Sequence, residues 1–144
     1  MENNKEKKFN HRVPIQIRFS DIDPINHVNN AVILEYYDVG RINYFETVLG
    51  KKLNWNELLV VIVHTENDYY ESINKEDNIY VETRIEKFGT KSMHTFQRIV
   101  DKNTNKIKST CKTVLAGFDR NNNCSVEIPE NFKQMFYEFE NNLI

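Results

Sequence analysis

One long segment constrains the fold of this chain more than any other, because residues 31–49 repeat apolar side chains at helical spacing. At ~100° per residue, two adjacent arcs of the helical wheel are apolar, and together they cover about half of it. The arcs consist of Ala31, Leu34, Ile42, Phe45 and Leu49, and of Ile33, Tyr37, Tyr44 and Val48. A surface helix carries a narrower stripe. We therefore expect the rest of the chain to wrap around this helix.

Strand-like stretches follow the helix. They cover residues 59–71, 78–87, 91–100 and 106–118. Gly89 and residues 101–105 stand where hairpin turns are needed, and strands joined by short turns form an antiparallel sheet. Apolar residues also alternate from Val13 to Phe19, which predicts one more strand, and Pro14 favours an edge position for it.

A second, short helix is predicted after Pro129, because four apolar residues have helical spacing there. These residues are Phe132, Met135, Phe136 and Phe139. Asn29 or Asn30 is suited to cap the start of the long helix, and Gly50 is suited to end it. We therefore predict an α+β fold, in which an antiparallel five-stranded sheet wraps around one long central helix.

The size and charge of the chain exclude several classes of protein. Its 144 residues fit one domain, and we predict a flexible N-terminus over residues 1–10 and a single domain over residues 11–144. A net charge of −2 does not favour nucleic-acid binding, which needs a basic face. No stretch approaches the ~20 apolar residues of a membrane span, and the N-terminus lacks the apolar core of a signal peptide. We expect a cytoplasmic protein without membrane association.

Polar side chains concentrate in one loop, residues 21–30, between the first strand and the long helix. The loop contains Asp21, Asp23, His27, Asn29 and Asn30. The first N–H groups of a helix are unpaired and the helix dipole is positive there, so this position stabilises a carbonyl oxygen that gains negative charge. A carboxylate beside it can act as a nucleophile or as a general base on water. The combination favours acyl transfer or hydrolysis.

Other interpretations of this loop stay open at the level of the residues. Asp and Asn are common before helices simply because they cap and turn the chain. Asp21, Asp23 and His27 could bind a divalent metal, although no second histidine or carboxylate cluster nearby completes the set. An EF-hand is excluded, because the chain has Asn26 and Val32 where such a loop needs Gly and an acid. A phosphotransferase loop would follow a fully apolar strand, whereas this strand alternates with charges.

The loop also resembles a known signature. The strings Phe19-Ser20-Asp21-Ile22-Asp23-Pro24 and His27-Val28-Asn29-Asn30-Ala31 are similar to those of hotdog-fold acyl-CoA thioesterases. The resemblance is to the 4-hydroxybenzoyl-CoA thioesterase-like family, and the order of elements matches over nearly the whole chain. It implies a hotdog fold and a thioesterase that hydrolyses acyl-CoA, or acyl carrier protein thioesters, with no metal and no organic cofactor.

The resemblance further implies roles for four residues of the loop. Asp23 would be the catalytic carboxylate, and the backbone N–H of Asn30 would polarise the thioester carbonyl. His27 and Asn29 match side chains that line the site in relatives. Whether the carboxylate attacks directly or activates water differs across the family, and the sequence does not decide it.

Two departures and one further match lie close to these residues. Asn26 stands where relatives often have Gly and Ile33 where they usually have Tyr, and we expect both to affect acyl specificity more than the fold. Relatives often continue with two acids and an Arg, as Glu35, Asp38 and Arg41 do here. Asp38 and Arg41 are three residues apart within the apolar arc, so we predict a partly buried ion pair rather than a solvated one. Glu35 is a weaker catalytic candidate.

Coenzyme A needs contacts of its own, because phosphates favour Lys, Arg and backbone N–H groups. One predicted hairpin turn offers Lys87, Gly89, Lys91 and Ser92, and relatives have a similar Gly, basic residue and Ser there. An exposed polar hairpin explains these residues equally well. Six aromatic residues could line an acyl tunnel, although most aromatics at such spacing belong to the core. They are Tyr36, Tyr37, Tyr44, Phe45, Tyr69 and Tyr70.

A sheet of this size hardly encloses a deep pocket alone, so we expect a second copy to close the site and predict a homodimer or a homotetramer. Two other functions remain as alternatives. A non-catalytic acyl-CoA-binding hotdog protein would keep the pocket without needing Asp23. A hotdog enoyl hydratase or dehydratase would carry a catalytic histidine in other motifs, which this chain lacks.

Overall fold

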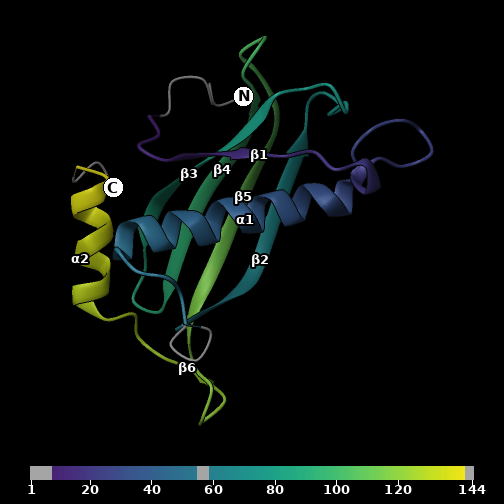
Figure 1. Ribbon diagram of the computed structural model, residues 1–144. Helices are drawn as coiled ribbons and strands as arrows, with labels where there is room; N and C mark the ends of the chain where they lie inside the picture. The colour runs from purple at the N-terminus through teal and green to yellow at the C-terminus, as the bar shows by residue number, and fades with distance from the viewer. Residues whose placement is uncertain (1–7, 55–58, 142–144) are drawn as a thin grey trace.

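The computed structural model describes residues 8–54 and 59–141. One antiparallel sheet has a long helix across one face, and a short helix lies beside the end of that helix (Figure 1). In chain order the elements are β1 (Arg12–Ile15), a 3-10 turn (Phe19–Asp21), α1 (Asn30–Leu49), β2 (Val60–Tyr69), β3 (Ile79–Phe88), β4 (Ser92–Asp101), β5 (Lys106–Asp119), β6 (Cys124–Ser125) and α2 (Glu130–Phe139). The predicted α+β class and both predicted helices are confirmed.

The strands form a sheet in the order β1-β3-β4-β5-β2, and β6 pairs with the end of β5. All neighbouring strands are antiparallel. Short hairpins require this for β3 with β4 and for β4 with β5, whereas β1–β3 and β2–β5 pair segments that are distant in the chain. The prediction of five strands missed β6, in which Cys124 and Ser125 pair with Asp119 and Phe118. Two residues are too few to show the alternation from which a strand can be recognised.

Strand β1 is shorter than the alternation from Val13 to Phe19 predicts. Ile15 pairs with Ile79, the first residue of β3, so the chain beyond Ile15 has no partner strand in β3. It turns instead into the 3-10 helix, where the Phe19 side chain is 84% exposed. Pro14 lies in an edge strand as predicted, since β1 pairs with β3 alone.

Helix α1 begins and ends where the sequence predicts. Asn29 is its N-cap, and Gly50 ends it in the left-handed conformation with a φ of 68°. The helix approaches the sheet closely at Gly40, where a Cβ atom would lie 2.5 Å from a methyl group of Val81. Any larger residue at this position would push the helix away from β3.

The sheet packs against one side of α1, and part of the opposite side stays exposed. Leu34 and Val39 belong to the uncovered side and remain 39% and 52% exposed. The buried side faces the sheet and holds Ile33, Tyr36, Tyr37, Gly40, Arg41, Tyr44 and Phe45. The apolar arc of the helix is therefore wider than the surface that its own sheet offers.

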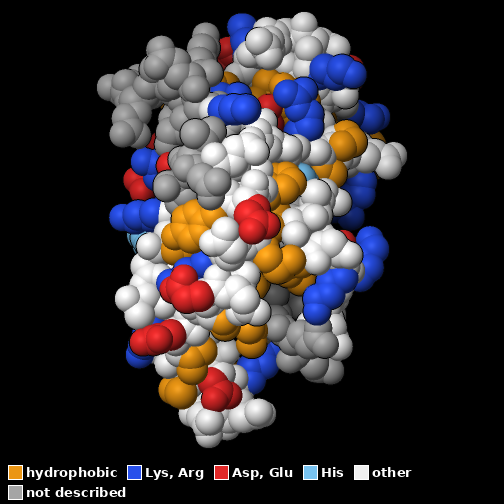
Figure 2. Space-filling view, turned by 90° about the vertical axis from the view of Figure 1, so that its left-hand side faces the viewer, with side chains coloured by type: hydrophobic (Ala, Val, Ile, Leu, Met, Phe, Trp, Pro, Cys, Tyr) orange, Lys and Arg blue, Asp and Glu red, His pale blue; other side chains and the backbone are white. Residues whose placement is uncertain are grey.

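The core has two parts, one near each end of α1. The first lies at the N-terminal half of the helix and includes Tyr37, Ile73 and Val81. The second is aromatic and joins α1 to α2, with the rings of Tyr44 and Phe136 centred 5.6 Å apart. Figure 2 views the molecule from the α2 side, where hydrophobic side chains are scattered among charged ones.

The chain before β1 makes contacts within the region for which the sequence predicts flexibility. The Phe9 ring lies 5.9 Å from that of Phe96, and Asn10 Nδ2 donates a hydrogen bond to Phe139 O. The rest of that prediction, over residues 1–7, lies outside the described residues, and the single-domain boundary at residue 11 stays a prediction. No helix of the described segments is long and apolar enough to cross a membrane.

Candidate active site

The loop between the 3-10 turn and α1 is folded back on itself. Ile22 and Val28 form an antiparallel bridge. Inside it, Asp23 N–H donates to His27 O at 3.0 Å, and Asn26 N–H donates to Asp23 O at 2.9 Å. Asn26 has a φ of 64°, a left-handed conformation that Asn tolerates better than most residues. The turn thus brings the predicted residues Asp23 and His27 to the two sides of one hairpin-like bend.

Asp21, the first acid of the loop, is a buried structural anchor. Its side chain accepts hydrogen bonds from Tyr36 Oη (2.5 Å), from Arg18 N–H (2.9 Å) and from Arg18 Nε (3.1 Å). Burial opposes its ionisation, but these hydrogen bonds and the Arg18 charge outweigh that effect and lower the pKa of Asp21. Its carbonyl oxygen accepts from Asn29 N–H at 3.0 Å, so the anchor reaches the start of α1.

Asp23, the second acid, has a carboxylate that is only partly used by the fold. Its Oδ1 accepts a hydrogen bond from Ile25 N–H at 3.0 Å, in a local turn. Its Oδ2 has no partner among the described residues, and the side chain is half-buried. One carboxylate oxygen thus fixes the side chain while the other is available to a substrate or to water.

The N-terminus of α1 supplies a hydrogen-bond donor beside this carboxylate. Asn29 Oδ1 accepts from Ala31 N–H at 2.8 Å, so the Asn29 side chain caps the helix. The N–H of Asn30, the first helical residue, finds no acceptor within the described segments. It points from the positive end of the helix dipole, where negative charge on an oxygen is stabilised.

A cavity of about 290 Å³ lies at this place, near the lower limit of about 300 Å³ for ligand pockets. From the loop and α1 it is lined by Asp23, Ile25, His27, Val28, Asn29, Asn30 and Ile33. Its other wall is Tyr69, Tyr70, Glu71, Ser72 and Ile73. The four residues to which the resemblance gives catalytic roles therefore line one cavity.

The second wall was largely missed by sequence reasoning. Tyr69 and Tyr70 belong to the six aromatics considered for an acyl tunnel, and both line the cavity, whereas Glu71, Ser72 and Ile73 carry no motif. A hydrogen bond of 2.8 Å from Val28 N–H to Ile73 O joins this wall to the loop. The remaining four aromatics of that set are buried in the core: Tyr36, Tyr37, Tyr44 and Phe45.

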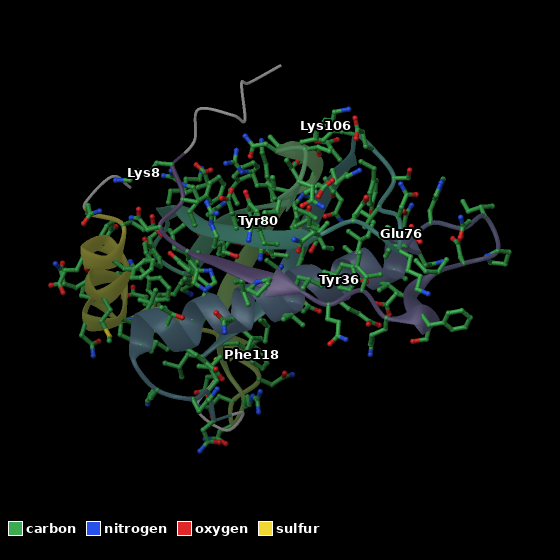
Figure 3. The ribbon with its side chains drawn as sticks, turned by 45° about the horizontal axis from the view of Figure 1, so that its top comes forward. Lys8, Tyr36, Glu76, Tyr80, Lys106 and Phe118 are labelled. Atoms are coloured by element: carbon green, nitrogen blue, oxygen red, sulfur yellow. The ribbon has the colours of Figure 1, made fainter. Side chains whose placement is uncertain are left out.

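The turn predicted to bind coenzyme A lies at the opposite end of the sheet. Ser92 pairs with Ala116, which pairs with Val61, so the turn is level with the start of β2, whereas the cavity adjoins its last residue, Tyr69. At roughly 3.3 Å per residue the two places are about 25 Å apart along the strand. In Figure 3, Glu76, which follows the cavity wall in sequence, lies toward the loop before α1. Phe118, two residues after the partner of Ser92, lies on the other side of α1. One chain therefore does not bring Lys87, Gly89, Lys91 and Ser92 into the cavity.

The ion pair between Asp38 and Arg41 is partly buried, as predicted. Arg41 Nη1 lies 2.7 Å from Asp38 Oδ1, and the exposed fractions of the Arg41 and Asp38 side chains are 6% and 62%. Arg41 Nη2 donates to Gln97 and Thr113 of the sheet, both at 3.1 Å. Glu35, the weaker candidate, lies outside the cavity lining, 64% exposed and 3.5 Å from an Arg18 nitrogen.

The loop does not assemble the metal site that was considered for it. Asp21 turns toward Tyr36 and Arg18, whereas Asp23 and His27 face the cavity. Throughout residues 8–54 and 59–141, no group of three or more His, Cys, Asp or Glu side chains could hold a metal ion.

Known proteins that are similar to this chain identify its family and its fold. The model of the thioesterase-like superfamily matches residues 17–136. A thioesterase from Thermus thermophilus, solved in complex with coenzyme A and Zn, is 27% identical; the match covers 94% of this chain and 98% of that chain, with a TM-score of 0.84. A search of curated proteins found no match.

Two further solved structures share the fold at lower identity. A thioesterase predicted in Bacillus stearothermophilus is 22% identical, with a TM-score of 0.81 and coverage of 89% of this chain and 94% of that one. A mutant of 4-hydroxybenzoyl CoA thioesterase, complexed with 4-hydroxybenzoyl CoA, is 15% identical, with a TM-score of 0.78 and coverage of 88% and 97%. The predicted hotdog fold and thioester hydrolase class are confirmed. The family match over residues 17–136 places this chain in the thioesterase-like superfamily.

Proposed function

We propose that this protein hydrolyses acyl-CoA thioesters in the cavity between the loop and residues 69–73. The observation that carries the proposal is the meeting of one available carboxylate oxygen, on Asp23, with the unpaired N–H of Asn30 in the same cavity. The complex of the Thermus thermophilus thioesterase with coenzyme A supports coenzyme A as the carrier. Acyl carrier protein is the second carrier to test.

The chemistry follows from the two groups. The thioester carbonyl oxygen accepts a hydrogen bond from Asn30 N–H, which stabilises the negative charge that develops on it. Asp23 either attacks the carbonyl carbon, forming an anhydride that water then hydrolyses, or takes a proton from the water that attacks. In both routes the carbon–sulfur bond breaks, the sulfur leaves as thiolate and is protonated, and the products are a free acid and a thiol. The ring of His27 orients water or substrate, and Asn29 holds the helix end.

A second copy of the chain completes this site in our proposal. β2 is an edge strand of the sheet, and its apolar residues Ile62 and Val63 are 48% and 59% exposed. An unpaired edge of this kind pairs readily with another strand. Antiparallel pairing of two β2 strands about a two-fold axis would bring the Lys91 turn of the second copy to the end where Tyr69 and the cavity lie. The predicted coenzyme A contacts would then come from that copy.

The dimer has its own test. Replacing Val63 with Lys places a charge on the exposed edge, and we expect a monomer by light scattering together with a loss of thioesterase activity. A monomer that keeps full activity would contradict the shared site. A tetramer and the cytoplasmic location stay predictions of the sequence.

One assay tests the function and separates it from the two alternatives. Purified protein is offered a panel of acyl-CoAs that differ in chain length and aromatic character, with a thiol-detecting reagent, and we expect thiol release. An enoyl-CoA in the same panel, followed by loss of its conjugated absorbance, detects a hydratase. Binding of acyl-CoA without release of thiol would identify a non-catalytic binder and would overturn the proposal.

A further inference from the structure

The second wall of the cavity is a segment without regular secondary structure. Residues 70–73 follow the end of β2 and form neither helix nor strand, yet they supply most of the side chains on that wall. Such a segment keeps a fixed position only where the rest of the molecule binds its backbone and side chains. The contacts that hold it therefore determine the shape of the cavity.

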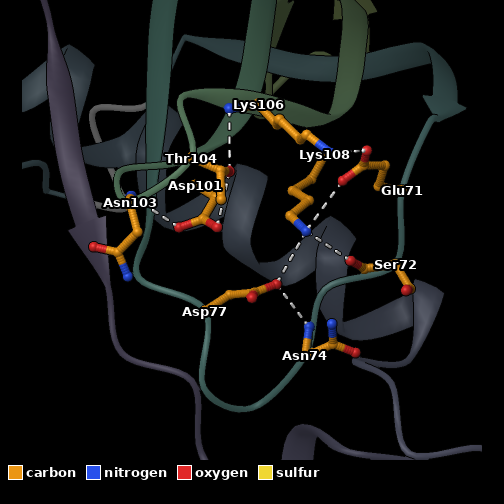
Figure 4. A network of polar contacts seen from close by, with 9 residues as sticks. All are labelled: Glu71, Ser72, Asn74, Asp77, Asp101, Asn103, Thr104, Lys106 and Lys108. Carbon is orange, nitrogen blue, oxygen red and sulfur yellow. Dashed lines mark hydrogen bonds and ion pairs between the residues drawn. The ribbon is translucent and has the colours of Figure 1, made fainter.

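One residue, Lys108 of β5, contacts this segment through both its backbone and its side chain, and Figure 4 shows the side-chain contacts. Its carbonyl oxygen accepts hydrogen bonds from Tyr70 N–H at 2.9 Å and from Glu71 N–H at 3.2 Å. Its Nζ donates to Ser72 O at 3.1 Å and lies 3.4 Å from Glu71 Oε2. Backbone and side chain of one residue thus hold three successive residues of the wall.

The Lys108 ammonium is buried, which makes it unusual for a lysine. The residue is 6% exposed, and its third acceptor is Asp77 Oδ2 at 3.2 Å. An ammonium has three N–H donors, and the three oxygens of Glu71, Ser72 and Asp77 use all of them. Asp77 in turn accepts from Asn74 N–H at 2.9 Å, so the ammonium is joined to the loop beyond the wall as well.

Lys106 provides an internal comparison. It lies two residues earlier in the same strand and contacts the same carboxylate, with Nζ 3.2 Å from Glu71 Oε1. Its side chain is 60% exposed, and it reaches neither Ser72 nor Asp77. Solvent screens an exposed ion pair, so the contact between Lys106 and Glu71 contributes little to fixing the wall.

We propose that Lys108 is a positioning residue of the cavity, whose buried ammonium fixes the wall formed by residues 70–73. The inference rests on the proposed function for its kinetic part, because that part concerns acyl-CoA held in this cavity. The wall carries neither Asp23 nor Asn30. Loosening it weakens the hold on substrate more than it changes the chemical step, so KM rises while kcat changes little.

The test compares Lys108→Met with Lys106→Met in the full chain, by two measurements. In Lys108→Met, amide hydrogen exchange of a peptide covering residues 70–77 should accelerate by at least about tenfold, with peptides of β3 unchanged. KM for acyl-CoA should rise by about tenfold, with kcat within about twofold of the parent. Lys106→Met should resemble the parent in both measurements.

The outcomes separate this inference from the proposed function. Parental exchange at residues 70–77 in Lys108→Met would overturn the inference whether or not the protein is an enzyme. A protein without thioesterase activity but with accelerated exchange would contradict the proposed function alone. If Lys108→Met does not fold, Asp77→Asn removes one charged acceptor and keeps an oxygen for Asn74 N–H. A smaller acceleration at the same peptide is then expected, and parental exchange would again overturn the inference.

Discussion

The hydroxyl of Tyr36 donates a hydrogen bond of 2.5 Å to Oδ2 of the buried carboxylate of Asp21. This contact joins α1, near its start, to the loop that carries Asp23. The carboxylate of Asp21 also accepts hydrogen bonds from Arg18, so one side chain joins the residue before the 3-10 turn to helix α1. The catalytic residues we propose thus lie on a loop whose position is set by the neighbouring acid.

Replacing Tyr36 with Phe should therefore reduce activity as well as stability. The change removes one donor from a buried carboxylate and should lower the free energy of unfolding by about 1–3 kcal/mol. Tyr37→Phe is the matched control, because the Tyr37 hydroxyl donates to Ser109 Oγ in the core and does not contact the loop. We expect a similar loss of stability in both, measured by urea unfolding, and a fall of kcat in Tyr36→Phe only. Equal activity in the two variants would contradict the claim that the contact between Tyr36 and Asp21 positions the loop.

The left-handed turn at Asn26 predicts an unequal response to two substitutions. Asn26→Gly should keep stability and activity, because Gly adopts a φ of 64° without strain. Asn26→Val should cost about 1–2 kcal/mol of the free energy of unfolding and lower kcat, since a branched side chain resists this conformation. Asn105→Val, at a φ of 58° in the turn between β4 and β5, should lose stability and keep activity. Parental stability in Asn26→Val would show that the turn is not constrained.

Replacing Arg41 should lower the stability of the protein more than replacing Asp38, its ion-pair partner. Arg41→Met removes one donor from each of the buried oxygens of Gln97 and Thr113, and we expect a loss of about 1–3 kcal/mol in urea unfolding. Asp38→Asn removes a carboxylate that is mostly exposed, and should cost less than about 1 kcal/mol. Equal losses in the two variants would contradict the assignment of Arg41 to the interior.

A buried carboxyl group at the end of α2 predicts a dependence of stability on pH. Burial raises the pKa of Glu140, although the Tyr44 hydroxyl, at 2.6 Å, partly counteracts this. The folded state then holds a proton that the unfolded state has already released, so stability falls as pH rises from about 4.5 through the folded pKa.

Glu140→Gln keeps an acceptor for Tyr44 and removes this titration. The free energy of unfolding of Glu140→Gln, relative to that of the parent protein, should increase as pH rises through this window. Urea titrations at pH 4, 5, 6 and 7 measure this difference. A difference that is constant over these pH values would show that Glu140 has the same pKa in both states.

Sequence patterns predicted helices and strands well where these depend on periodic apolar residues or on local capping residues. The alternation in residues 78–87 places β3 within one residue of its observed bounds, and Asn29 and Gly50 mark the ends of α1. The same alternation failed at Phe19, because the length of β1 depends on where β3 begins. The apolar alternation within one strand does not show where its partner strand begins.

The candidate site likewise has one part that the sequence predicted and one part that it did not. Asp23, His27, Asn29 and Asn30 are close together in sequence and were predicted together from one loop. The wall at residues 70–73 is brought to them by the pairing of β2 with β5 and by Lys108, which are contacts between distant segments. The turn at Lys91 was grouped with the site by resemblance, although its own chain holds it at the far end of the sheet.

The role of Asp23 is the central claim, and one comparison tests it most directly. Thiol release from a saturating acyl-CoA is measured for the parent protein, for Asp23→Asn and for Glu35→Gln, an exposed acid outside the cavity lining. We predict that kcat falls by at least about 100-fold in Asp23→Asn, while acyl-CoA binding persists and Glu35→Gln stays near the parent. Parental thiol release by a folded Asp23→Asn variant would contradict the account.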